Sequence, residues 1–291
     1  MAGWKFETVV PAAAAETFAA AVESLCPAVA SFEIPGGTLW RIEGYASDMP
    51  PHAEAAAAMA VAAARAGIAE PEFTCIPLPD TDWVADNQAS FQPLHAGRYF
   101  IQPSHFDGAA PHGTTALTVD AGAAFGTGEH ATTKSCLLAL DGLAKRCQFR
   151  RPLDLGCGSG ILALAMAATW HRPIMAADID PQSVVVAREN AEINGLDGWL
   201  RIRCSNGVAD REVRKAGPYD LIVANILAGP LVALSHRLSA CLAPRGVLIL
   251  SGLLAQQENA VRNAYRRQGL SLRHRIALDG WHTLIVARNS F

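Results

Sequence analysis

A strand-like segment followed by three closely spaced glycines lies at the middle of the chain. Residues 152–160 read Pro-Leu-Asp-Leu-Gly-Cys-Gly-Ser-Gly, and an apolar run follows over residues 161–168. The first segment predicts a buried strand that stops at glycine, and the apolar run predicts a helix packed on a sheet. A strand, a glycine turn and a helix in this order hold a nucleotide at the carboxyl edge of an open α/β sheet.

The spacing of these glycines distinguishes between ligands. Dinucleotide folds use G-x-G-x-x-G, which seats a pyrophosphate on a helix N-terminus. Here Asp154 precedes Gly156, Gly158 and Gly160, which stand at alternate positions. A carboxylate repels a pyrophosphate but tolerates or favours a cationic ligand. Glycine, which has no Cβ, lets the ligand approach the backbone closely. The pattern therefore predicts a site for S-adenosylmethionine, and a glycine turn without a ligand remains the alternative.

Composition narrows the class of protein. The chain has 291 residues, half of them hydrophobic, which is enough for one large or two modest domains. Its net charge of −3 gives no sign of a nucleic-acid surface. Seven cysteines without a C-x-x-C pair argue against a disulfide framework and a structural zinc site. The nine histidines show no ligand spacing, so we expect no metal.

The sequence predicts neither export nor a membrane span. Charged residues interrupt the N-terminal region, at Lys5, Glu7, Glu16 and Glu23, which does not fit a signal peptide. The longest uncharged apolar run, near Ile161, is too short to cross a bilayer. We therefore expect a cytoplasmic protein with reduced thiols and no membrane partner.

The first part of the chain predicts a small domain over residues 1–79. Alternating runs and alanine-rich helical runs follow one another in the order strand, helix, strand, strand, helix, strand. These elements are expected at residues 4–10, 13–25, 28–34, 39–46, 52–66 and 73–78. The order βαββαβ is typical of a ferredoxin-like α+β fold, for which we expect a packing or substrate-docking role.

A linker and a larger domain follow this module. Residues 80–93 are expected to form a linker helix, and the second domain is expected to span residues 94–291. Strands and helices alternate through the second domain, which argues for a doubly wound, parallel α/β sheet of the Rossmann type. The last two runs, residues 271–278 and 281–287, predict an antiparallel pair.

A second glycine-rich segment, from Asp120 to Thr133, precedes a helix expected to end near Lys145. Thr132 or Thr133 is the expected N-cap of this helix. Because a helix N-terminus attracts anions, the segment can form a flap over the methionine carboxylate of the donor, with Phe125 excluding water. An ordinary cap after a tight turn explains the pattern equally well.

Two acids and an asparagine follow later strands. Asp178 ends the strand expected at residues 173–178, about twenty residues after the glycine turn, where an acid binds ribose hydroxyls. Asp180 precedes Pro181, and Pro is favoured at the first position of a helix. We therefore assign the helix cap to Asp180 and the ribose contact to Asp178. Asn225 ends an almost continuously apolar strand, as buried parallel strands do.

Four motifs in this order resemble those of the PrmA family, the methyltransferases of large-subunit ribosomal protein eleven. The family's flap, D-P-G-x-A-F-G-T-G-x-H-P-T-T, is similar to residues 120–133. Its donor loop, D-x-G-C-G-S-G, is similar to residues 154–160. Its D-I-D-P and A-N-I-L-A-x-P-L are similar to residues 178–181 and 224–231.

The resemblance implies a seven-stranded methyltransferase sheet, S-adenosylmethionine as the methyl donor, and ribosomal protein eleven as a substrate docked by the N-terminal domain without nucleic acid. In the family the donor contacts one residue in each motif. The matching residues are Thr133, Gly156, Asp178 and Asn225, and the same motifs add Phe125, Gly126, Asp154 and Gly158 as cofactor-binding candidates. The sequence departs from the family at Ala121 and Ala131, which replace Pro, and at Asn87 and His105, which replace Trp.

Methyl transfer to nitrogen requires a neutral amine. A lysine has an unperturbed pKa of about 10.4, so neutralising it near pH 7 costs roughly 4–5 kcal/mol, whereas an α-amine near 7.7–8.0 costs far less. Both amines are candidate targets. No general base stands at a convincing spacing, and Asn225 is the expected catalytic residue, accepting hydrogen bonds from the target amine or the donor. The alternative is a strand-end Asn that caps the next helix.

Three other functions fit parts of the pattern. The same donor fold can act on another protein lysine, such as that of an electron-transfer flavoprotein, although the complete N-terminal module favours the ribosomal target. A nicotinamide oxidoreductase would need a different glycine spacing. A non-enzymatic ribosome-binding protein that kept the fold is the third alternative.

Overall fold

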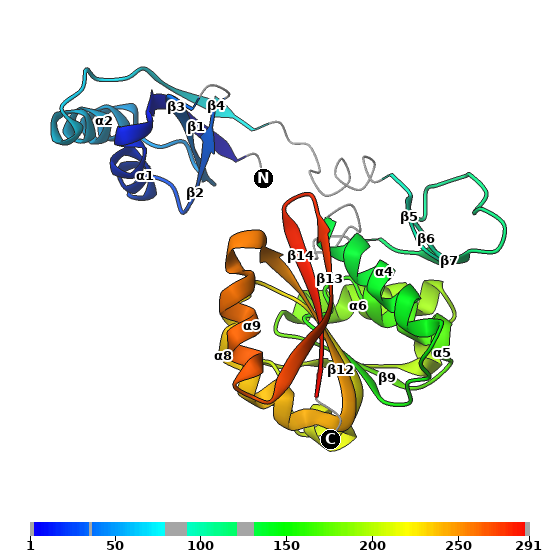
Figure 1. Cartoon of the computed structure of the whole chain (residues 1–291). Coiled ribbons are helices and arrows are strands. Elements are labelled where there is room, and N and C mark those ends of the chain that lie inside the picture. Colours follow the sequence, from blue (N-terminus) through cyan, green and yellow to red (C-terminus); the bar gives the residue numbers. More distant parts are fainter. Residues whose placement is uncertain (1–2, 35–36, 79–91, 121–130, 289–291) are drawn as a thin grey trace. The chain divides into compact units, whose positions relative to one another are not determined.

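The structure is a computed structural model that describes residues 3–34, 37–78, 92–120 and 131–288. The chain divides into two compact units, one up to Trp83 and the other from Val84 (Figure 1). Residues 80–91 of the expected linker helix and residues 121–130 of the expected flap lie outside the described residues. Each unit is considered separately below.

The N-terminal unit has the predicted ferredoxin-like fold. Its four strands form an antiparallel sheet in the order β2-β3-β1-β4. Phe6 and Ile42 of the sheet pack against Phe18 and Met59 of the two helices, so both helices cover one face. The elements are β1 (Trp4–Pro11), α1 (Ala15–Glu23), β2 (Ala28–Glu33), β3 (Leu39–Ala46), α2 (His52–Ala66) and β4 (Phe73–Pro77).

The second unit is built on the predicted seven-stranded sheet, in the order β10-β9-β8-β11-β12-β14-β13. The first five strands are parallel, and the last two form the predicted antiparallel pair, with β14 also antiparallel to β12. The strands are β8 (Pro152–Leu155), β9 (Ile174–Asp178), β10 (Leu200–Cys204), β11 (Tyr219–Asn225), β12 (Leu242–Leu254), β13 (Leu270–Leu278) and β14 (Trp281–Arg288).

Helices cover both faces of this sheet, as a doubly wound fold requires. One buried cluster joins the sheet to α4 (Ala131–Ala144), α5 (Ile161–Trp170) and α6 (Pro181–Ile193). A second cluster joins the opposite face to α8 (Ala228–Cys241) and α9 (Glu258–Arg266) (Figure 1). The near-continuous apolar sequences of β8, β9 and β11 follow from this burial on both faces.

Two short elements were not predicted. Residues 98–102 and 115–119 were expected as strands and form β6 (Tyr99–Gln102) and β7 (Thr115–Thr118) of a small sheet, but its third strand, β5 (Leu94–Ala96), was missed because three residues are too few to show a periodicity. The helix α7 (Arg211–Ala216), which the Asp210 side chain caps, was also missed, because six residues are too few to show a helical periodicity. Among the described residues, no helix is long and apolar enough to cross a membrane, and no three His, Cys, Asp or Glu side chains form a possible metal site.

Candidate functional site

The predicted site residues lie where the parallel strands end. Strands β9, β8 and β11 are neighbours, so Asp178, the glycine turn after β8 and Asn225 share the carboxyl edge of the sheet. The strands that follow β8 in the chain, β9 and β10, lie on one side of it, and the next strand, β11, lies on the other side. The order of the strands therefore reverses at β8, which is the topological switch point of the sheet. Ligands of open α/β sheets bind at such points.

The glycine turn has a backbone conformation that would be strained in residues with a side chain. Gly156, Gly158 and Gly160 have φ values of +71°, +52° and +83°, in the left-handed region. The amides of Gly156 and Cys157 both donate to the carbonyl of Ala177 on β9, at 2.8 and 3.1 Å. The turn is therefore fixed to the neighbouring strand before any ligand binds.

A contact between Gly156 and Ile226 joins the glycine turn to the segment after β11. A Cβ placed on Gly156 would lie 2.2 Å from the Cγ2 atom of Ile226. On its other side, Ile226 is held by β12, because its amide donates to the Ser251 carbonyl at 3.2 Å and its own carbonyl lies against Gly252. Sequence analysis gave no role to Ile226 or Gly252, although Ile226 lies within the A-N-I-L motif.

Asp178 is held by the backbone around it. Its Oδ2 accepts a hydrogen bond from the Gly158 amide at 2.8 Å, and its Oδ1 accepts one from the Asp180 amide at 3.0 Å. Asp180 caps α6, accepting hydrogen bonds from the amides of Gln182 and Ser183, so the predicted cap is confirmed. Each Asp178 oxygen keeps a further lone pair, which leaves it able to accept from a ligand hydroxyl.

Asp154 lies beneath the turn and is fully buried. Its Oδ2 accepts a hydrogen bond from the Ala163 amide in the first turn of α5 at 2.8 Å, and its Oδ1 has no partner among the described residues. Burial raises the pKa of the Asp154 carboxyl to about 7, and the nearby Asp178 adds to the rise. A bound cation or hydrogen-bond donor near this oxygen would offset the cost of its burial.

Asn225 and Thr133 meet across the sheet edge. The Asn225 Nδ2 atom donates to the Thr133 Oγ1 atom at 3.5 Å, a long contact between the end of β11 and the first turn of α4. Thr133 is buried and Asn225 is partly exposed. Helix α4 already includes Ala131, so neither Thr132 nor Thr133 is its N-cap, and that prediction was wrong.

A chain of buried hydroxyls fixes the first turn of α4 to the sheet. Thr283 Oγ1, on β14, lies 2.6 Å from both Ser135 Oγ on α4 and Ser251 Oγ on β12. Ser135 also donates to the Thr132 carbonyl at 2.9 Å. Ser251 pairs with Asn225 in the β11–β12 register. The network therefore sets where Thr133 stands relative to Asn225, and the sequence gave no signal for it.

Two large apolar side chains are exposed at the same edge. Ile179, next to Asp178, is 65% exposed, and Leu227, two residues after Asn225, is 70% exposed. Exposed side chains of this size near a polar cradle are candidates to contact the flat face of a ligand base. Both were inside recognised motifs but had no predicted role.

The structure thus brings Gly156, Gly158 and Asp178 together on one side of the edge, with Thr133 and Asn225 near it on the other. Phe125 and Gly126 lie outside the described residues, so their predicted contacts remain predictions. Such an edge offers acceptors for hydroxyls and amines and a buried carboxylate for a cation.

Comparison with known proteins identifies relatives of the chain. The model of one protein family, described as Ribosomal protein L11 methyltransferase (PrmA), matches residues 19–289. A ribosomal protein L11 methyltransferase of Rhodopseudomonas palustris (strain BisB5) is 39% identical over 261 residues, covering 90% of this chain and 88% of the relative. A protein of the same name from Caulobacter sp. (strain K31) is 42% identical over 211 residues, covering 72% of this chain and 73% of the relative.

A solved structure agrees with these sequence relatives. The crystal structure of a ribosomal protein L11 methylase from Lactobacillus delbrueckii subsp. bulgaricus is similar with a TM-score of 0.63 and 28% sequence identity. The similarity covers 69% of this chain and all of that one.

Proposed function

The chain belongs to the family of ribosomal protein L11 methyltransferases, and from this premise we propose that it transfers methyl groups from S-adenosylmethionine to amino groups of ribosomal protein L11. The acceptors are lysine side chains or the N-terminal α-amine. The observation that carries the proposal is the meeting of the family's motifs at one sheet edge, where Asn225 reaches Thr133 and Ile226 packs on Gly156.

The chemistry of the edge fits S-adenosylmethionine. When bound, this donor supplies a methyl group that its positively charged sulfur has already activated. A ligand with a sulfonium and an ammonium group suits the buried Oδ1 of Asp154, which has no partner among the described residues, whereas a pyrophosphate does not. The left-handed glycines leave room that a Cβ at Gly156 or Gly160 would fill.

Each predicted residue has a role that its position supports. Asp178 accepts from the ribose hydroxyls, Gly156 and Gly158 let the backbone approach the ligand, and Thr133 holds the amino-acid end. Asp154 supports the turn and adds negative charge for the cationic donor. Phe125 and Gly126, in the flap, are assigned to cover the donor.

Asn225 is proposed as the residue that orients the target amine. Its Nδ2 faces Thr133, so its Oδ1 is left to accept a hydrogen bond from the incoming amine. An acceptor there aligns the nitrogen lone pair with the methyl group, and alignment of this kind lowers the barrier by fixing orientation in advance. The amine must lose its proton first, and transfer into a drier site favours the neutral form.

The N-terminal unit, residues 1–79, is proposed to dock the ribosomal protein, with residues 80–93 as the linker. The sheet face opposite its helices carries both signs of charge, because Lys5 pairs with Glu7 at 2.7 Å and with Glu43 at 2.8 Å. A mixed-charge face is able to bind a polar protein surface. We expect the transfer reaction itself to need neither nucleic acid nor membrane, and the ribosomal target supports a cytoplasmic location.

Labelled methyl transfer tests the proposal. Purified chain, labelled S-adenosylmethionine and purified ribosomal protein L11 should give a labelled L11 band, and mass spectrometry then identifies the modified amines. An electron-transfer flavoprotein serves as the competing substrate in parallel. Labelling of the flavoprotein without labelling of L11 would reject the substrate, and calorimetry that detects NADH binding but no S-adenosylmethionine binding would reject the donor.

A further inference from the structure

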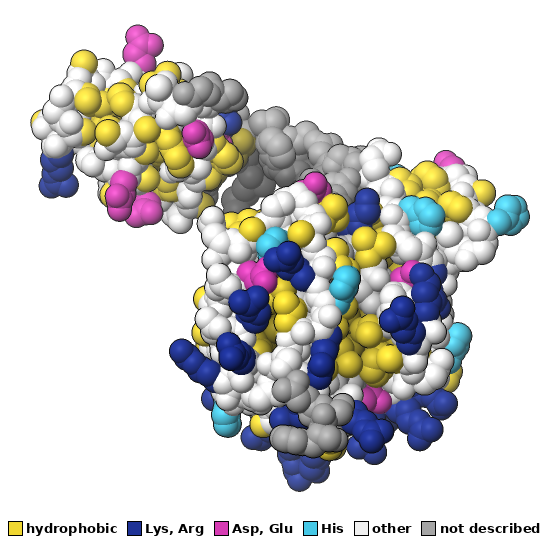
Figure 2. Space-filling model, in the orientation of Figure 1, with side chains coloured by type: hydrophobic (Ala, Val, Ile, Leu, Met, Phe, Trp, Pro, Cys, Tyr) yellow, Lys and Arg dark blue, Asp and Glu magenta, His cyan; other side chains and the backbone are white. Residues whose placement is uncertain are grey.

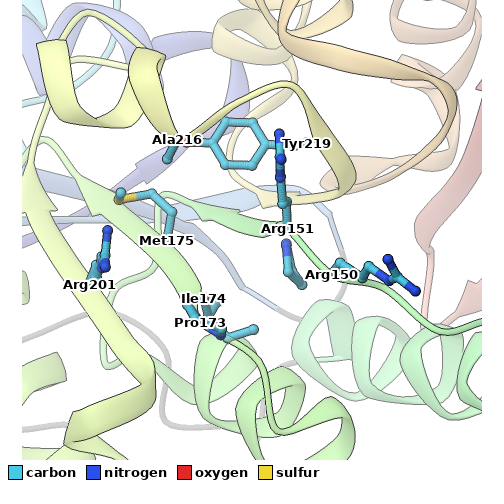
Figure 3. A pocket seen from close by; sticks show the side chains of 9 residues that line it. Arg150, Arg151, Pro173, Ile174, Met175, Arg201, Ala216 and Tyr219 are labelled. Carbon is cyan, nitrogen blue, oxygen red and sulfur yellow. The ribbon is translucent and has the colours of Figure 1, made fainter.

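A cavity of about 280 Å³ lies at the amino edge of the large sheet, opposite the donor site (Figure 3). Pro173, Ile174 and Met175 line its apolar part, at the start of β9. The cavity is bounded by Arg150 and Arg151, which precede β8, and by Arg201 of β10. Figure 3 shows Arg201 on one side of the opening and the other two arginines across from it.

These three arginines are exposed and unpaired. None of the three guanidinium groups has a hydrogen-bond or ion-pair partner among the described residues, and no Asp or Glu lines the cavity. Asp220 lies nearby, but its carboxylate accepts from the backbone amides of Arg150 and Arg151 at 2.6 and 2.9 Å. The three positive charges therefore face solvent together without a compensating acid in the cavity.

The ordinary explanation of cations at this edge does not account for them. Lys and Arg in the last turn of a helix stabilise its negative end. Arg150 and Arg151 stand several residues beyond the end of α4 at Ala144, and Arg201 lies within a strand. In the part of the chain that the structure describes, no partner explains the position of these arginines.

Positive charge continues beyond the cavity along the same edge. Further basic residues stand near the strand starts: Arg172 before β9, Arg214 and Lys215 before β11, and Arg245 in the first part of β12. Figure 2 shows Lys and Arg side chains gathered along the lower edge of this unit. These cations gather at one edge although the net charge of the whole chain is −3.

We propose that this cavity and edge bind the phosphate backbone of RNA. Arginine forks pair with phosphate oxygens in a bidentate geometry, and a line of cations matches a ligand with a charge on every nucleotide better than it matches one small anion. The apolar part of the cavity, at Pro173 and Met175, accepts the uncharged part of a nucleotide.

The donor site and the proposed RNA site lie at opposite edges of the large sheet, so both can be occupied at the same time. An RNA bound at the amino edge leaves the carboxyl edge open to the target amine. That the natural ligand is ribosomal RNA rests on the proposed function, since a ribosomal protein brings this RNA with it. RNA binding itself is measured without methyl transfer, so its failure and the failure of the proposed function are told apart.

The test measures affinity for a short, fluorescein-labelled, single-stranded oligoribonucleotide by anisotropy over a series of salt concentrations. In the R150Q/R151Q/R201Q variant we expect affinity to fall about tenfold or more, and the slope of log K against log salt to become shallower by about 2. Circular dichroism and S-adenosylmethionine binding should match the unaltered chain, which shows that the variant is folded.

A matched variant controls for net charge. Arg65→Gln, Arg237→Gln and Arg266→Gln together remove the same charge from exposed positions that do not line the cavity, and they should change RNA affinity less than threefold. Equal losses in the two variants would overturn the proposal, as would undetectable binding by the unaltered chain at low salt. Binding of polyglutamate as tight as that of RNA would also overturn it.

Discussion

The side-chain amide of Asn225 donates to the hydroxyl of Thr133 at 3.5 Å, although 92 residues separate them in the chain. The contact joins the carboxyl end of β11 to the first turn of α4. It occupies the amide nitrogen of Asn225 and leaves the amide oxygen available, which determines the kind of group that Asn225 can receive. An amine that donates a hydrogen bond fits this oxygen. The pair therefore joins the part of the site assigned to the methyl donor, at Thr133, to the part assigned to the target amine, at Asn225.

Asn225→Ala should lower kcat for L11 methylation by about 100-fold or more, because the amine loses the acceptor that orients it. The melting temperature should stay within a few degrees, since Asn225 is partly exposed. Labelled-methyl transfer measures the rate. Asn263→Ala, on the exposed surface of α9, is the matched control and should be fully active. Near-normal turnover by Asn225→Ala would remove the catalytic assignment.

Gly156→Ala should destabilise the chain by at least ~1–2 kcal/mol, because alanine is strained at φ +71° and its Cβ meets Ile226. S-adenosylmethionine binding, measured by calorimetry, should weaken about tenfold or more as the turn shifts. Gly142→Ala is the control, since nothing lies within 4 Å of its Cβ position in α4, and it should stabilise by about 0.5–1 kcal/mol. Equal behaviour of the two variants would contradict the role of the turn.

Asp154 makes folding and ligand binding depend on pH in opposite ways. Because burial raises the pKa of its carboxyl from 3.8 to about 7, the folded chain keeps a proton that the unfolded chain has released between these values. Its contribution to stability is complete below pH 3.8 and is lost as the pH rises through about 7. The cationic donor favours the ionised form, so donor affinity should fall as the pH drops below about 7.

Asp154→Asn separates these two effects. At pH values above about 7, the free energy of unfolding of the variant should be higher by ~1–4 kcal/mol than that of the unaltered chain, because the variant lacks the buried charge. The upper end of this range follows from the rise of about three units in the pKa of the Asp154 carboxyl, at about 1.36 kcal/mol per unit. The same variant should bind S-adenosylmethionine more weakly and lose the pH dependence of binding. Denaturant titration and calorimetry measure the two quantities, and donor affinity that stays constant through pH 7 in the unaltered chain would contradict the role of Asp154.

Thr283→Val should cost about 1–3 kcal/mol of stability, since it removes the hydroxyl between Ser135 and Ser251 and leaves both without this partner. We also expect a higher KM for S-adenosylmethionine with kcat less affected, because the first turn of α4 is held less firmly beside the donor. Thr283→Ser keeps the hydroxyl and should restore KM. If KM stays unchanged in Thr283→Val while stability falls, the network has a structural role alone.

Local patterns predicted most of the fold. Alternation of apolar strands and helices gave the doubly wound sheet, and the pair of runs at 271–278 and 281–287 gave its antiparallel edge, because periodicity is a local property of the chain. The three-residue strand β5 and the six-residue helix α7 were missed because each contains fewer than two full repeats of its period. The assignment of Asp180 as a helix cap succeeded because a cap depends only on neighbouring residues.

Contacts between distant segments could not be predicted in the same way. The hydroxyl network of Ser135, Ser251 and Thr283 joins three elements, and a serine or threonine in a strand carries no mark of its partners. The packing of Ile226 on Gly156 likewise depends on which strands become neighbours. Net charge also hid the segregation of arginines at the amino edge, since a sum of charges contains no positions.

Adjacent residues specify a buried strand, a glycine turn preceded by Asp154 and a helix, so the sequence was enough to predict a sheet edge that binds a nucleotide-type ligand. Tertiary packing set which side chains face one another across that edge, because it buried Asp154 beneath the turn and brought Asn225 to Thr133. Strand order and helix packing bring together residues far apart in the chain, and these are global consequences of burying one core on both faces of a sheet.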